Sequence, residues 1–455
     1  MNKNELKPAS VFEQFAKINT IPRPSKREEK MIDYLKSWGE SHHLETHVDQ
    51  TGNVIIRKGA TPGYEQRKTV ILQSHMDMVC DKLVDVEFDF DRDAIQTYVD
   101  GEWLRAKGTT LGADDGIGCA IELAILEADD IEHGPLECVF TRDEETGLSG
   151  AEGMKSDFMK GDYLINLDSE DEGEIFVSCA GGRNTQARFT FQREEAPQGH
   201  FFVKAQLKGL VGGHSGDDIN KQRANAIKLL GRFLFQTISR YEGVRLAQFH
   251  SGKLHNAIPR DGMFVIGVPS DLKENVKADW NVFAADVARH FVWALQAVDN
   301  GIYAICQDPE LNGMVETSSN IAAVHTAETE LTILSSQRSN VMSNLDNMCA
   351  TFRATFQLAG AEAWSSDGYP AWKMKAESHL RDTVVDCYRE LFGREPVVRG
   401  IHAGLECGLF SERYPNLDMV SFGPTLRGVH SPDECLHIPT VQMVWDHLLL
   451  VLKRI

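Results

Sequence analysis

Histidine and carboxylate residues follow directly after several apolar runs of this sequence, where a metal ion could bind. The first such segment is QSHMD, in which His75 ends an apolar run and Asp77 lies two residues further on. In extended backbone these two side chains point to the same face. Asp77 could therefore accept a hydrogen bond from the imidazole and fix the tautomer that binds a metal. A histidine at the end of a strand is more often structural, so the pair alone leaves both interpretations open.

Three further acidic segments occupy similar positions. Asp114 and Asp115 stand between glycines in GADDG, just before a predicted helix, Glu144 and Glu145 follow a second apolar run, and Asp168 follows a third. An aspartate before a helix can simply cap its N-terminus, and an acidic run can be an exposed turn. Two adjacent glutamates at the edge of a sheet could instead divide two roles, with one binding metal and the other accepting a proton.

His430 lies in a late segment, VHSPDE, close to the last predicted helix. Ser431 and Pro432 are also compatible with a plain turn in which His430 has no role. Considered together, however, the five segments supply two histidines and three carboxylates as possible ligands. That set of nitrogen and oxygen donors is typical of a pair of zinc, manganese or cobalt ions.

The elements that must position these residues are short strands alternating with helices. A capping box at Ser25 predicts a helix that ends at Gly39, and a second helix is predicted over residues 117–127. Buried strands are predicted at residues 69–74 (TVILQS), 136–141 (LECVFT) and 163–167 (YLINL). This alternation predicts an α/β domain with a mostly parallel sheet and helices on both faces. The carboxyl ends of such strands meet at the edge where open α/β sheets bind ligands.

The pattern changes after Gly181-Gly182 and returns to α/β after Tyr369-Pro370. Strand-like runs between them are FFVKAQL (201–207), MFVIGV (263–268) and CATFRATFQL (349–358), and helical patterns cover residues 222–241 and about 275–298. We therefore expect a catalytic domain of residues 1–182 and 373–455, interrupted by an inserted α+β domain of residues 183–372.

Composition narrows the class of protein. The 455 residues carry a formal net charge of −20, which argues against a nucleic-acid partner because phosphate binding needs clustered basic residues. Nine scattered cysteines without a CxxC motif argue against a disulfide framework or a thiolate zinc site. No apolar run is long enough to cross a bilayer, and no secretory signal opens the chain. We expect a cytoplasmic protein without a membrane partner.

The ordered motifs HMD, GADDG, DEETG, NLDSE and HSPDE resemble those of the co-catalytic metallopeptidase family that includes aminoacylase, carboxypeptidase G and carnosinase. The segments GTTLGADDGIG, HGPLE, CAGG, GGHSG, HNAIPR and HAGLECG resemble its aminoacyl-histidine dipeptidase branch. The similarity extends from about residue 5 to residue 453. It implies an α/β catalytic domain interrupted by a lid domain.

The resemblance also implies a role for each of the candidate residues. Asp114 would bridge two divalent ions, zinc in the first place and manganese or cobalt as alternatives. His75 and Asp168 would complete one site, and Glu145 and His430 the other. Glu144 matches the general base and Asp77 the residue that orients His75. His437 is a rival for His430, but the HxxxE spacing of His430 and Glu434 matches the family. The family further suggests a cis peptide bond after Asp114.

Substrate contacts are implied for His214, Asn256 and Arg353 in the lid and for the backbone of Gly404 in the catalytic domain. His214 would stabilise an oxyanion and Arg353 would bind a substrate carboxylate, although a glycine-rich turn is the plainer interpretation of GGHSG. The implied activity is hydrolysis of unblocked dipeptides, including Xaa-His dipeptides, by a homodimer that forms through the lid.

Other activities stay open at this point. A tripeptidase, aminoacylase or deacylase could have the same metal core. A noncatalytic metal-binding protein is a further alternative, but such a protein would need no general base. A serine hydrolase is disfavoured because the sequence contains no GxSxG motif.

Overall fold

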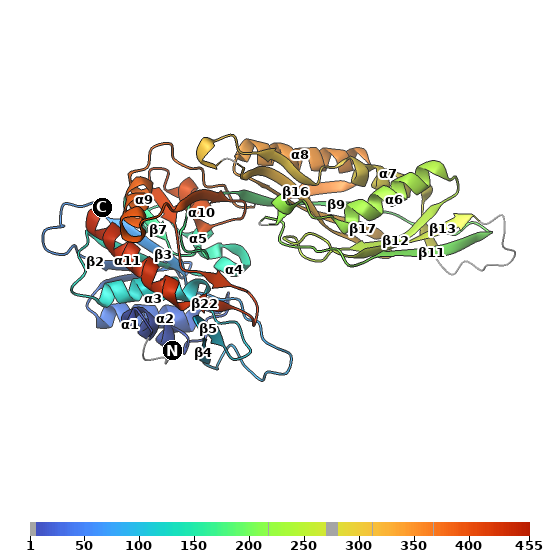
Figure 1. Cartoon of the computed structure of the whole chain (residues 1–455). Coiled ribbons are helices and arrows are strands. Elements are labelled where there is room, and N and C mark those ends of the chain that lie inside the picture. The colour runs from blue at the N-terminus through green and yellow to red at the C-terminus, as the bar shows by residue number, and fades with distance from the viewer. Residues whose placement is uncertain (1–5, 217, 270–280, 312, 367) are drawn as a thin grey trace. The chain divides into compact units, whose positions relative to one another are not determined.

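The chain divides into two units, each assembled from segments that are far apart in the sequence. A computed structural model describes residues 6–216, 218–269, 281–311, 313–366 and 368–455. Unit 1 comprises residues 1–177, 374–400 and 409–455, and unit 2 comprises residues 178–373 and 401–408 (Figure 1). The short segment 401–408 therefore groups with the middle of the chain.

The main sheet of unit 1 is parallel at its centre and antiparallel at its sides. Its strand order is β1 (Glu45–Val48), β2 (Val54–Lys58), β6 (Leu136–Thr141), β3 (Val70–His75), β7 (Tyr163–Asn166), β20 (Asp418–Ser421), β8 (Glu174–Cys179) and β19 (Val397–Ile401). β3 pairs in parallel with β6 and β7, and β7 with β20, whereas β1, β2 and β8 pair in antiparallel fashion. Every residue of β3, β6 and β7 is buried, so both faces of the centre are covered. The predicted α/β class is confirmed, and β6, β3, β7 and β20 pair in parallel at the centre of the sheet.

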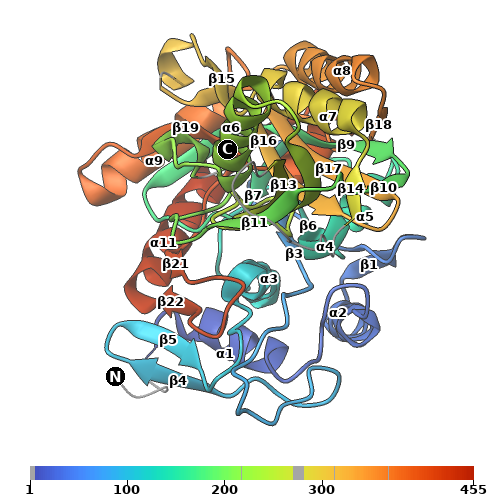
Figure 2. The same ribbon diagram turned by 90° about the vertical axis from the view of Figure 1, so that its right-hand side faces the viewer.

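Helices and a small sheet complete unit 1. The helices are α1 (Ala9–Ile18), α2 (Glu29–Ser41), α3 (Ala113–Glu127), α4 (Glu144–Gly147), α5 (Ser149–Gly153), α9 (His379–Phe392), α10 (Glu406–Arg413) and α11 (Ile438–Arg454). The small sheet contains β21 (Leu426–Arg427), β22 (Cys435–His437), β5 (Trp103–Ala106) and β4 (Thr97–Asp100). α3 packs between α1 and β3, and α9 packs on α11 and β20 (Figures 1 and 2). α3 is apolar and buried on nearly all sides, which fixes its first turn beside the end of β3.

The predicted capping box at Ser25 is wrong. The helix begins only at Glu29, and Ser25 Oγ lies near the carbonyl of Met78 at 3.5 Å instead of capping it. Glu28 does bend back, because its carboxylate accepts the N–H of Lys26 at 2.6 Å.

Unit 2 is an antiparallel sheet covered by helices. The sheet order is β11 (His200–Leu207), β13 (Gly262–Pro269), β12 (Arg245–Ser251), β16 (Val315–Thr326), β17 (Glu330–Ser339), β9 (Gly181–Thr190) and β18 (Glu362–Ser365), with β15 (Gly301–Ile305) paired to β16. A second, two-stranded sheet joins β10 (Arg193–Glu195) and β14 (Asn281–Phe283), and short 3₁₀ helices cover Ile219–Lys221 and Pro309–Leu311. The helices α6 (Ala226–Arg240), α7 (Ala285–Ala297) and α8 (Met342–Leu358) lie along one face of the large sheet (Figure 1).

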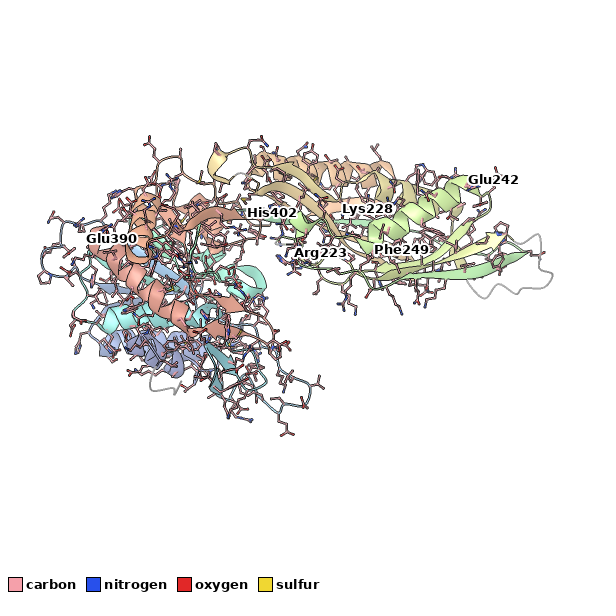
Figure 3. The ribbon with its side chains drawn as sticks, viewed as in Figure 1. Arg223, Lys228, Glu242, Phe249, Glu390 and His402 are labelled. Carbon is pink, nitrogen blue, oxygen red and sulfur yellow. The ribbon has the colours of Figure 1, made fainter. Side chains whose placement is uncertain are left out.

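An aromatic core fills the space between these helices and the sheet. Phe249 of β12, Phe264 of β13, Phe291 of α7 and Phe356 of α8 are all fully buried in it. Lys228 of α6 donates to carbonyl oxygens at the C-terminal end of α7, including that of Leu295 at 2.8 Å, and so ties the two helices together (Figure 3).

Two predictions for this unit need correction. The run 349–358 was expected to be a strand, but it forms the second half of α8. The buried residues of this run are Cys349, Phe352 and Phe356, and their spacings of three and four residues are those of a helix. The predicted helix at 275–298 begins at Ala285, and residues 275–280 of that prediction lie outside the described residues.

Candidate metal centre

The candidate residues of unit 1 leave neighbouring strands at one edge of the sheet. β3 and β6 run in parallel with His75 opposite Thr141, and α4, which begins three residues after Thr141, carries Glu144 and Glu145. β7 lies on the other side of β3, and Asp168 follows it. The carboxyl ends of three adjacent strands thus deliver their polar residues to one place, as the alternation of strands and helices predicted.

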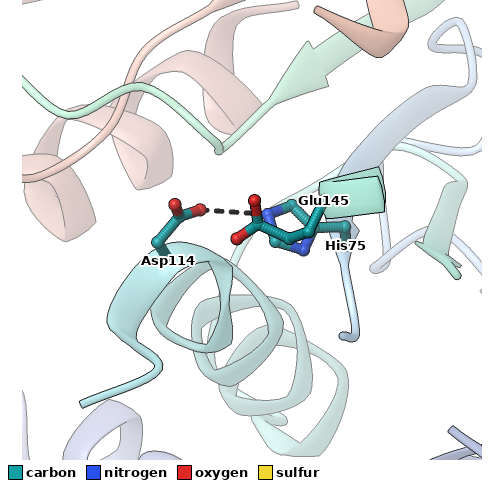
Figure 4. Close-up of side chains that lie close together, drawn as sticks. All are labelled: His75, Asp114 and Glu145. Atoms are coloured by element: carbon teal, nitrogen blue, oxygen red, sulfur yellow. Dashed lines mark hydrogen bonds and ion pairs between the residues drawn. The ribbon is translucent and has the colours of Figure 1, made fainter. Parts of the chain in front are cut away.

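Two histidines converge on the two oxygens of a single carboxylate. His75 Nε2 lies 3.0 Å from Asp114 Oδ1, and His430 Nε2 lies 3.0 Å from Asp114 Oδ2 (Figure 4 shows the first of these contacts). Each imidazole also meets a second acid, because His75 Nε2 is 3.4 Å from Asp168 Oδ1 and His430 Nε2 is 2.9 Å from Glu145 Oε2. The five residues form two half-sites that share Asp114.

Asp77 holds the first histidine and the loop after β6. One oxygen lies 3.4 Å from His75 Nδ1, on the side of the ring opposite Asp114. The same carboxylate accepts the N–H of Glu144 at 3.1 Å and the N–H of Glu145 at 3.3 Å. Although burial opposes it, His75, the side chain of Ser25 and the N–H of Glu144 hold the pKa of Asp77 below its usual value. Asp77 is therefore an ionised carboxylate that sets the position of three candidate residues at once.

The paired aspartates at the start of α3 divide two roles. Asp115 Oδ1 accepts the N–H of Gly118 at 3.1 Å, which is the capping bond expected of an aspartate at a helix start. Asp114 instead points its carboxylate at the two histidines, and Figure 4 shows its contact with His75. The predicted cis peptide bond between Asp114 and Asp115 is present. The capping interpretation of GADDG thus applies to Asp115, and Asp114 stays the candidate metal ligand.

The charges of the cluster are strongly coupled. Burial, and then repulsion by Asp114, raises the pKa of Glu145 to about 7, and burial also raises the pKa of Asp168 to about 6. Hydrogen bonds to Asp114 and Glu145 raise the pKa of His430 to about 11. Although burial opposes it, Asp168 and Asp114 raise the pKa of His75 well above its usual value. The buried carboxylates of this cluster need positive charge nearby, and protons on the two histidines supply it in the absence of metal.

The residues fit a pair of divalent cations. Single ligand atoms of His75, Asp114 and Glu145 all lie within 4.8 Å of one another, and Glu145 Oε1 is buried without a hydrogen-bond partner in the described part of the chain. Imidazole nitrogens and carboxylate oxygens are donors that zinc, manganese and cobalt accept. Asp114 has an imidazole beside each of its carboxylate oxygens, so these residues would be able to hold two ions.

The rival histidine lies elsewhere. His437 Nε2 is 3.8 Å from Glu102, and its ring packs on that of Trp103 with centroids 4.8 Å apart. The turn before it is built by Ser431, whose hydroxyl bonds the carbonyl of Gly428 at 2.7 Å. The geometry thus brings His430, and not His437, to Asp114.

Three of the four candidate substrate residues belong to one chain of contacts in unit 2. The backbone carbonyl of Asn256 accepts the N–H of Ser215 at 2.8 Å, which sets His214 and Asn256 on adjacent backbone segments. A Cβ placed on Gly216 would lie 2.5 Å from the carbonyl oxygen of His402, so segment 401–408 packs against this turn (Figure 3 labels His402). Gly404 of that segment belongs to unit 2, whereas the sequence predicted it in the catalytic domain.

Arg353 is not part of that chain of contacts. It lies on α8, where its Nη1 is 3.4 Å from Ser365 Oγ of β18. Ser365 bonds Thr185, which in turn bonds Gln337 of β17, so these side chains share the face of the sheet that α8 covers.

A different arginine, which the sequence did not single out, lies on the opposite face. Arg338 follows Gln337 in β17, and successive side chains of a strand point to opposite faces. It is buried, Nη1 donates to the hydroxyl of Tyr369 at 2.8 Å, and Nε has no hydrogen-bond partner among the described residues. The ring of Tyr369 packs against Gly404, where a Cβ would lie 2.6 Å from it. Partial burial, and then the positive charges of Arg338 and His214, lower the pKa of His255.

Comparison with known proteins identifies the class of protein. The chain belongs to the peptidase family M20/M25/M40, whose family description matches residues 71–454. Among individual relatives, the cytosol non-specific dipeptidase of Escherichia coli (strain K12) is 40% identical over 481 aligned positions, which cover 99% of each chain. The crystal structure of aminoacylhistidine dipeptidase from Vibrio alginolyticus is 42% identical, with a TM-score of 0.88 over 100% of this chain and 98% of that one. The resemblance seen in the motifs is thereby confirmed.

More distant structures share the fold alone. The aminopeptidase PepT from Bacillus cereus is 15% identical to this chain, with a TM-score of 0.61 over 98% of each chain. Within the described ranges, no helix has both the length and the apolar character that a membrane span requires.

Proposed function

We propose that the chain is a metal-dependent dipeptidase that hydrolyses unblocked dipeptides, including those of the Xaa-His type. The observation that supports this most strongly is the pair of imidazoles on the two oxygens of Asp114, each with a second carboxylate beside it. Two relatives of this chain, a cytosol non-specific dipeptidase and an aminoacylhistidine dipeptidase, support the same activity by their names.

In this proposal the five residues of the cluster hold two divalent ions. His75 and Asp168 bind one ion, Glu145 and His430 bind the other, and Asp114 binds both. We propose zinc as the native ion, with manganese or cobalt as alternatives that the same donors accept. When bound, the two ions would polarise the scissile carbonyl and lower the pKa of the attacking water.

The proton transfers fall to Glu144. Its backbone N–H is fixed on Asp77, so its side chain begins at a defined point next to the cluster. It would accept the proton of the attacking water and return that proton to the departing amine. Asp77 is a positioning residue, because it orients His75 and accepts the N–H groups of Glu144 and Glu145.

Unit 2 would supply the contacts to the substrate. We propose that His214 donates to the oxyanion, that Asn256 contacts the substrate and that Gly404 does so through its backbone. The support is that the three lie along one chain of contacts within unit 2.

A cationic side chain in this unit would bind the free carboxylate of the dipeptide. The sequence names Arg353, whereas the geometry favours Arg338, because it is buried beside Tyr369 and Gly404 and has an unpartnered Nε. A guanidinium pairs with a carboxylate through two parallel bonds, which a lysine cannot reproduce. Arg338→Lys should therefore raise KM for dipeptides more than for their amides, and Arg353→Lys should leave both unchanged. The reverse result would assign the role to Arg353.

The substrate class is tested with a panel of compounds. Purified protein loaded with Zn²⁺ is expected to hydrolyse Ala-Ala, Gly-His and carnosine, and to leave an N-acetyl amino acid intact. Cleavage of the N-acetyl amino acid without cleavage of dipeptides would favour an aminoacylase or deacylase. A preference for a tripeptide over all dipeptides would favour a tripeptidase.

We further propose a cytoplasmic homodimer that forms through unit 2. Large apolar side chains on the helices of this unit are exposed, with Phe233 of α6 at 54%, Tyr241 just after α6 at 54% and Trp293 of α7 at 37%. Light scattering on the eluted peak of a sizing column should give twice the mass of one chain. A charged substitution at Phe233 should then reduce this mass to that of the monomer.

A further inference from the structure

Two buried ionic side chains outside the candidate ligand set hold the loop that carries Asp114. They are Arg23, before α2, and Glu434, after the last candidate ligand. Both are almost completely buried, with 1% and 2% of their surfaces exposed. In the described part of the chain, neither has an oppositely charged side chain within ion-pair distance. Burying an ion without such a partner is costly, so its hydrogen bonds to the backbone must compensate.

Glu434 binds the backbone N–H groups at the start of α3. One oxygen accepts from Leu111 at 2.8 Å and Gly112 at 3.0 Å, and the other from Ala113 at 2.8 Å and Asp114 at 3.4 Å. These are donors that a helix start leaves without intrahelical partners, and a carboxylate satisfies both them and the helix dipole. Glu434 is four residues after His430 in the chain. Its carboxylate therefore fixes the loop of His430 against the loop of Asp114.

Arg23 binds the carbonyl side of the same loop. Nη2 donates to the carbonyl of Gly112, and Nη1 donates to the carbonyls of Asp77 at 2.8 Å and Met76 at 3.3 Å. Met76 and Asp77 directly follow His75, so one guanidinium joins the loop of His75 to the loop of Asp114. The backbone carbonyl of Arg23 also accepts the N–H of Met78 at 3.2 Å, which keeps Arg23 itself in place.

The side chains of Arg23 and Glu434 both bond the backbone of one glycine, Gly112. The N–H of Gly112 bonds Glu434, and its carbonyl bonds Arg23. Gly112 has a φ of +66°, and a Cβ at this position would lie 2.5 Å from Arg23 Nη2. A Cβ on Gly116, one turn into α3, would meet the same nitrogen at 2.5 Å. Both glycines of GADDG thus make room for the guanidinium.

We propose that Arg23 and Glu434 are positioning residues that set the spacing between His75, Asp114 and His430. Neither belongs to the proposed metal ligands or substrate contacts. Arg23 sets the spacing of the half-site that contains His75, and Glu434 sets that of the half-site that contains His430. This inference rests on the proposed function, because it assigns the residues a role in forming the metal centre.

The test compares Glu434→Gln with a matched control, Glu137→Gln. Glu137 is likewise a buried carboxylate of unit 1 that accepts backbone N–H groups, from Lys160 at 2.8 Å and Gly161 at 3.0 Å, but it lies near the start of β6. In Glu434→Gln, the new NH₂ group faces two backbone N–H donors and leaves them without an acceptor. Both variants should melt at a lower temperature than the wild type.

Only Glu434→Gln should change the metal centre. Calorimetric titration of the metal-free proteins with Co²⁺ should show an affinity at least about 10-fold lower at one of the two sites, the size of effect seen when the supporting residues of a metal site are removed. The visible absorption of the Co²⁺ form should change with it. In the metal-free variant, hydrogen exchange of the amides of residues 111–114 should speed up. Glu137→Gln should match the wild type in all three measurements.

Other outcomes overturn the inference in distinct ways. If the wild type binds two Co²⁺ ions and Glu434→Gln keeps the same affinities, spectrum and exchange rates, the positioning role is wrong and the proposed function stands. If the wild type binds no Co²⁺, the positioning role and the proposed function are both wrong. If Glu434→Gln does not fold, Arg23→Lys is compared with Arg57→Lys. Arg57 of β2 likewise donates to a backbone carbonyl, that of Phe158 at 2.9 Å, and its Nε lies 2.8 Å from Glu137. One ammonium group cannot reach the carbonyls of both loops, so Arg23→Lys should lose affinity for Co²⁺ and Arg57→Lys should not.

Discussion

Metal binding to the cluster should release a number of protons that follows from the charges of its ligands. Ligands must be deprotonated to bind a metal ion. In the metal-free protein at pH 7, His75 and His430 hold about one proton each, since the pKa of the first is raised well above its usual value and that of the second is about 11. Glu145, with a pKa of about 7, holds about half a proton, and Asp168, with a pKa of about 6, holds about a tenth.

The expected release is therefore about two and a half protons per chain at pH 7. At pH 6 it rises to about three and a half, because Glu145 and Asp168 are more protonated, and at pH 8 it falls to about two. Any proton lost from bound water adds to these numbers, so the ligands set a lower limit. The apparent affinity for the ions must accordingly increase with pH.

Calorimetry measures this release directly. Metal-free protein is titrated with Zn²⁺ at one pH in two buffers that differ in ionisation enthalpy, and the difference in heat gives the protons taken up by the buffer. His430→Asn should lower the release by about one proton. His437→Asn is the matched control, because this histidine lies against Trp103 and should not change the release. A release of less than one proton at pH 7, or equal losses in the two variants, would refute the assignment of the ligands.

Two further predictions concern stability. Gly112→Ala combines a left-handed backbone with a clash against Arg23, so it should destabilise the fold by about 2–4 kcal/mol. Gly101→Ala is the control, because Gly101 has a φ of +62° but open space around it, and this change should cost only about 1–2 kcal/mol. Equal losses of the free energy of unfolding in urea titrations would mean that Arg23 is not held in place. The metal-free protein should lose stability as pH rises, because the pKa values of Glu145 and Asp168 are raised in the folded state. The contribution of these two groups to the free energy of unfolding is complete below about pH 4 and is lost through pH 6–7. Excess Zn²⁺ should remove this fall in melting temperature between pH 5 and pH 8, and a fall that persists would place the responsible groups elsewhere.

Much of the metal centre could be predicted from the sequence because it depends on local patterns. Apolar runs that end in His75, Glu144 and Asp168 indicated strands, and parallel strands bring their carboxyl ends to one edge. The predicted strand at 136–141 has the observed bounds, and that at 69–74 is displaced by a single residue. The choice of His430 over His437 needed the family resemblance, since spacing alone does not tell which loop reaches Asp114.

Elements whose packing is decided by distant segments were harder to predict. The run 349–358 contains apolar residues that fit a strand, and only its packing on the sheet of unit 2 selects the helical pair Phe352 and Phe356. The family resemblance pointed to Arg353 and not to Arg338, because the burial of Arg338 and its contact with Tyr369 arise only in the folded structure.

Arg23 and Glu434 show the same limit more clearly. Glu434 bonds residues more than 300 positions away in the chain, and Arg23 bonds carbonyl oxygens, which every residue has. No spacing rule connects them to Asp114. The two glycines of GADDG are visible in the sequence. The buried guanidinium that requires glycine at these two positions is seen only in the structure.

Glu144→Gln provides the most direct test of the central claim, through its metal content and its turnover measured on the same sample. After equilibrium dialysis against Zn²⁺, wild type and variant should both hold two ions per chain. The wild type should hydrolyse Ala-Ala, and the variant should have lost at least about 100-fold of that rate, which is the low end for a general base. A variant that loses an ion would make Glu144 a ligand, and a variant that keeps full activity would contradict the proposed mechanism.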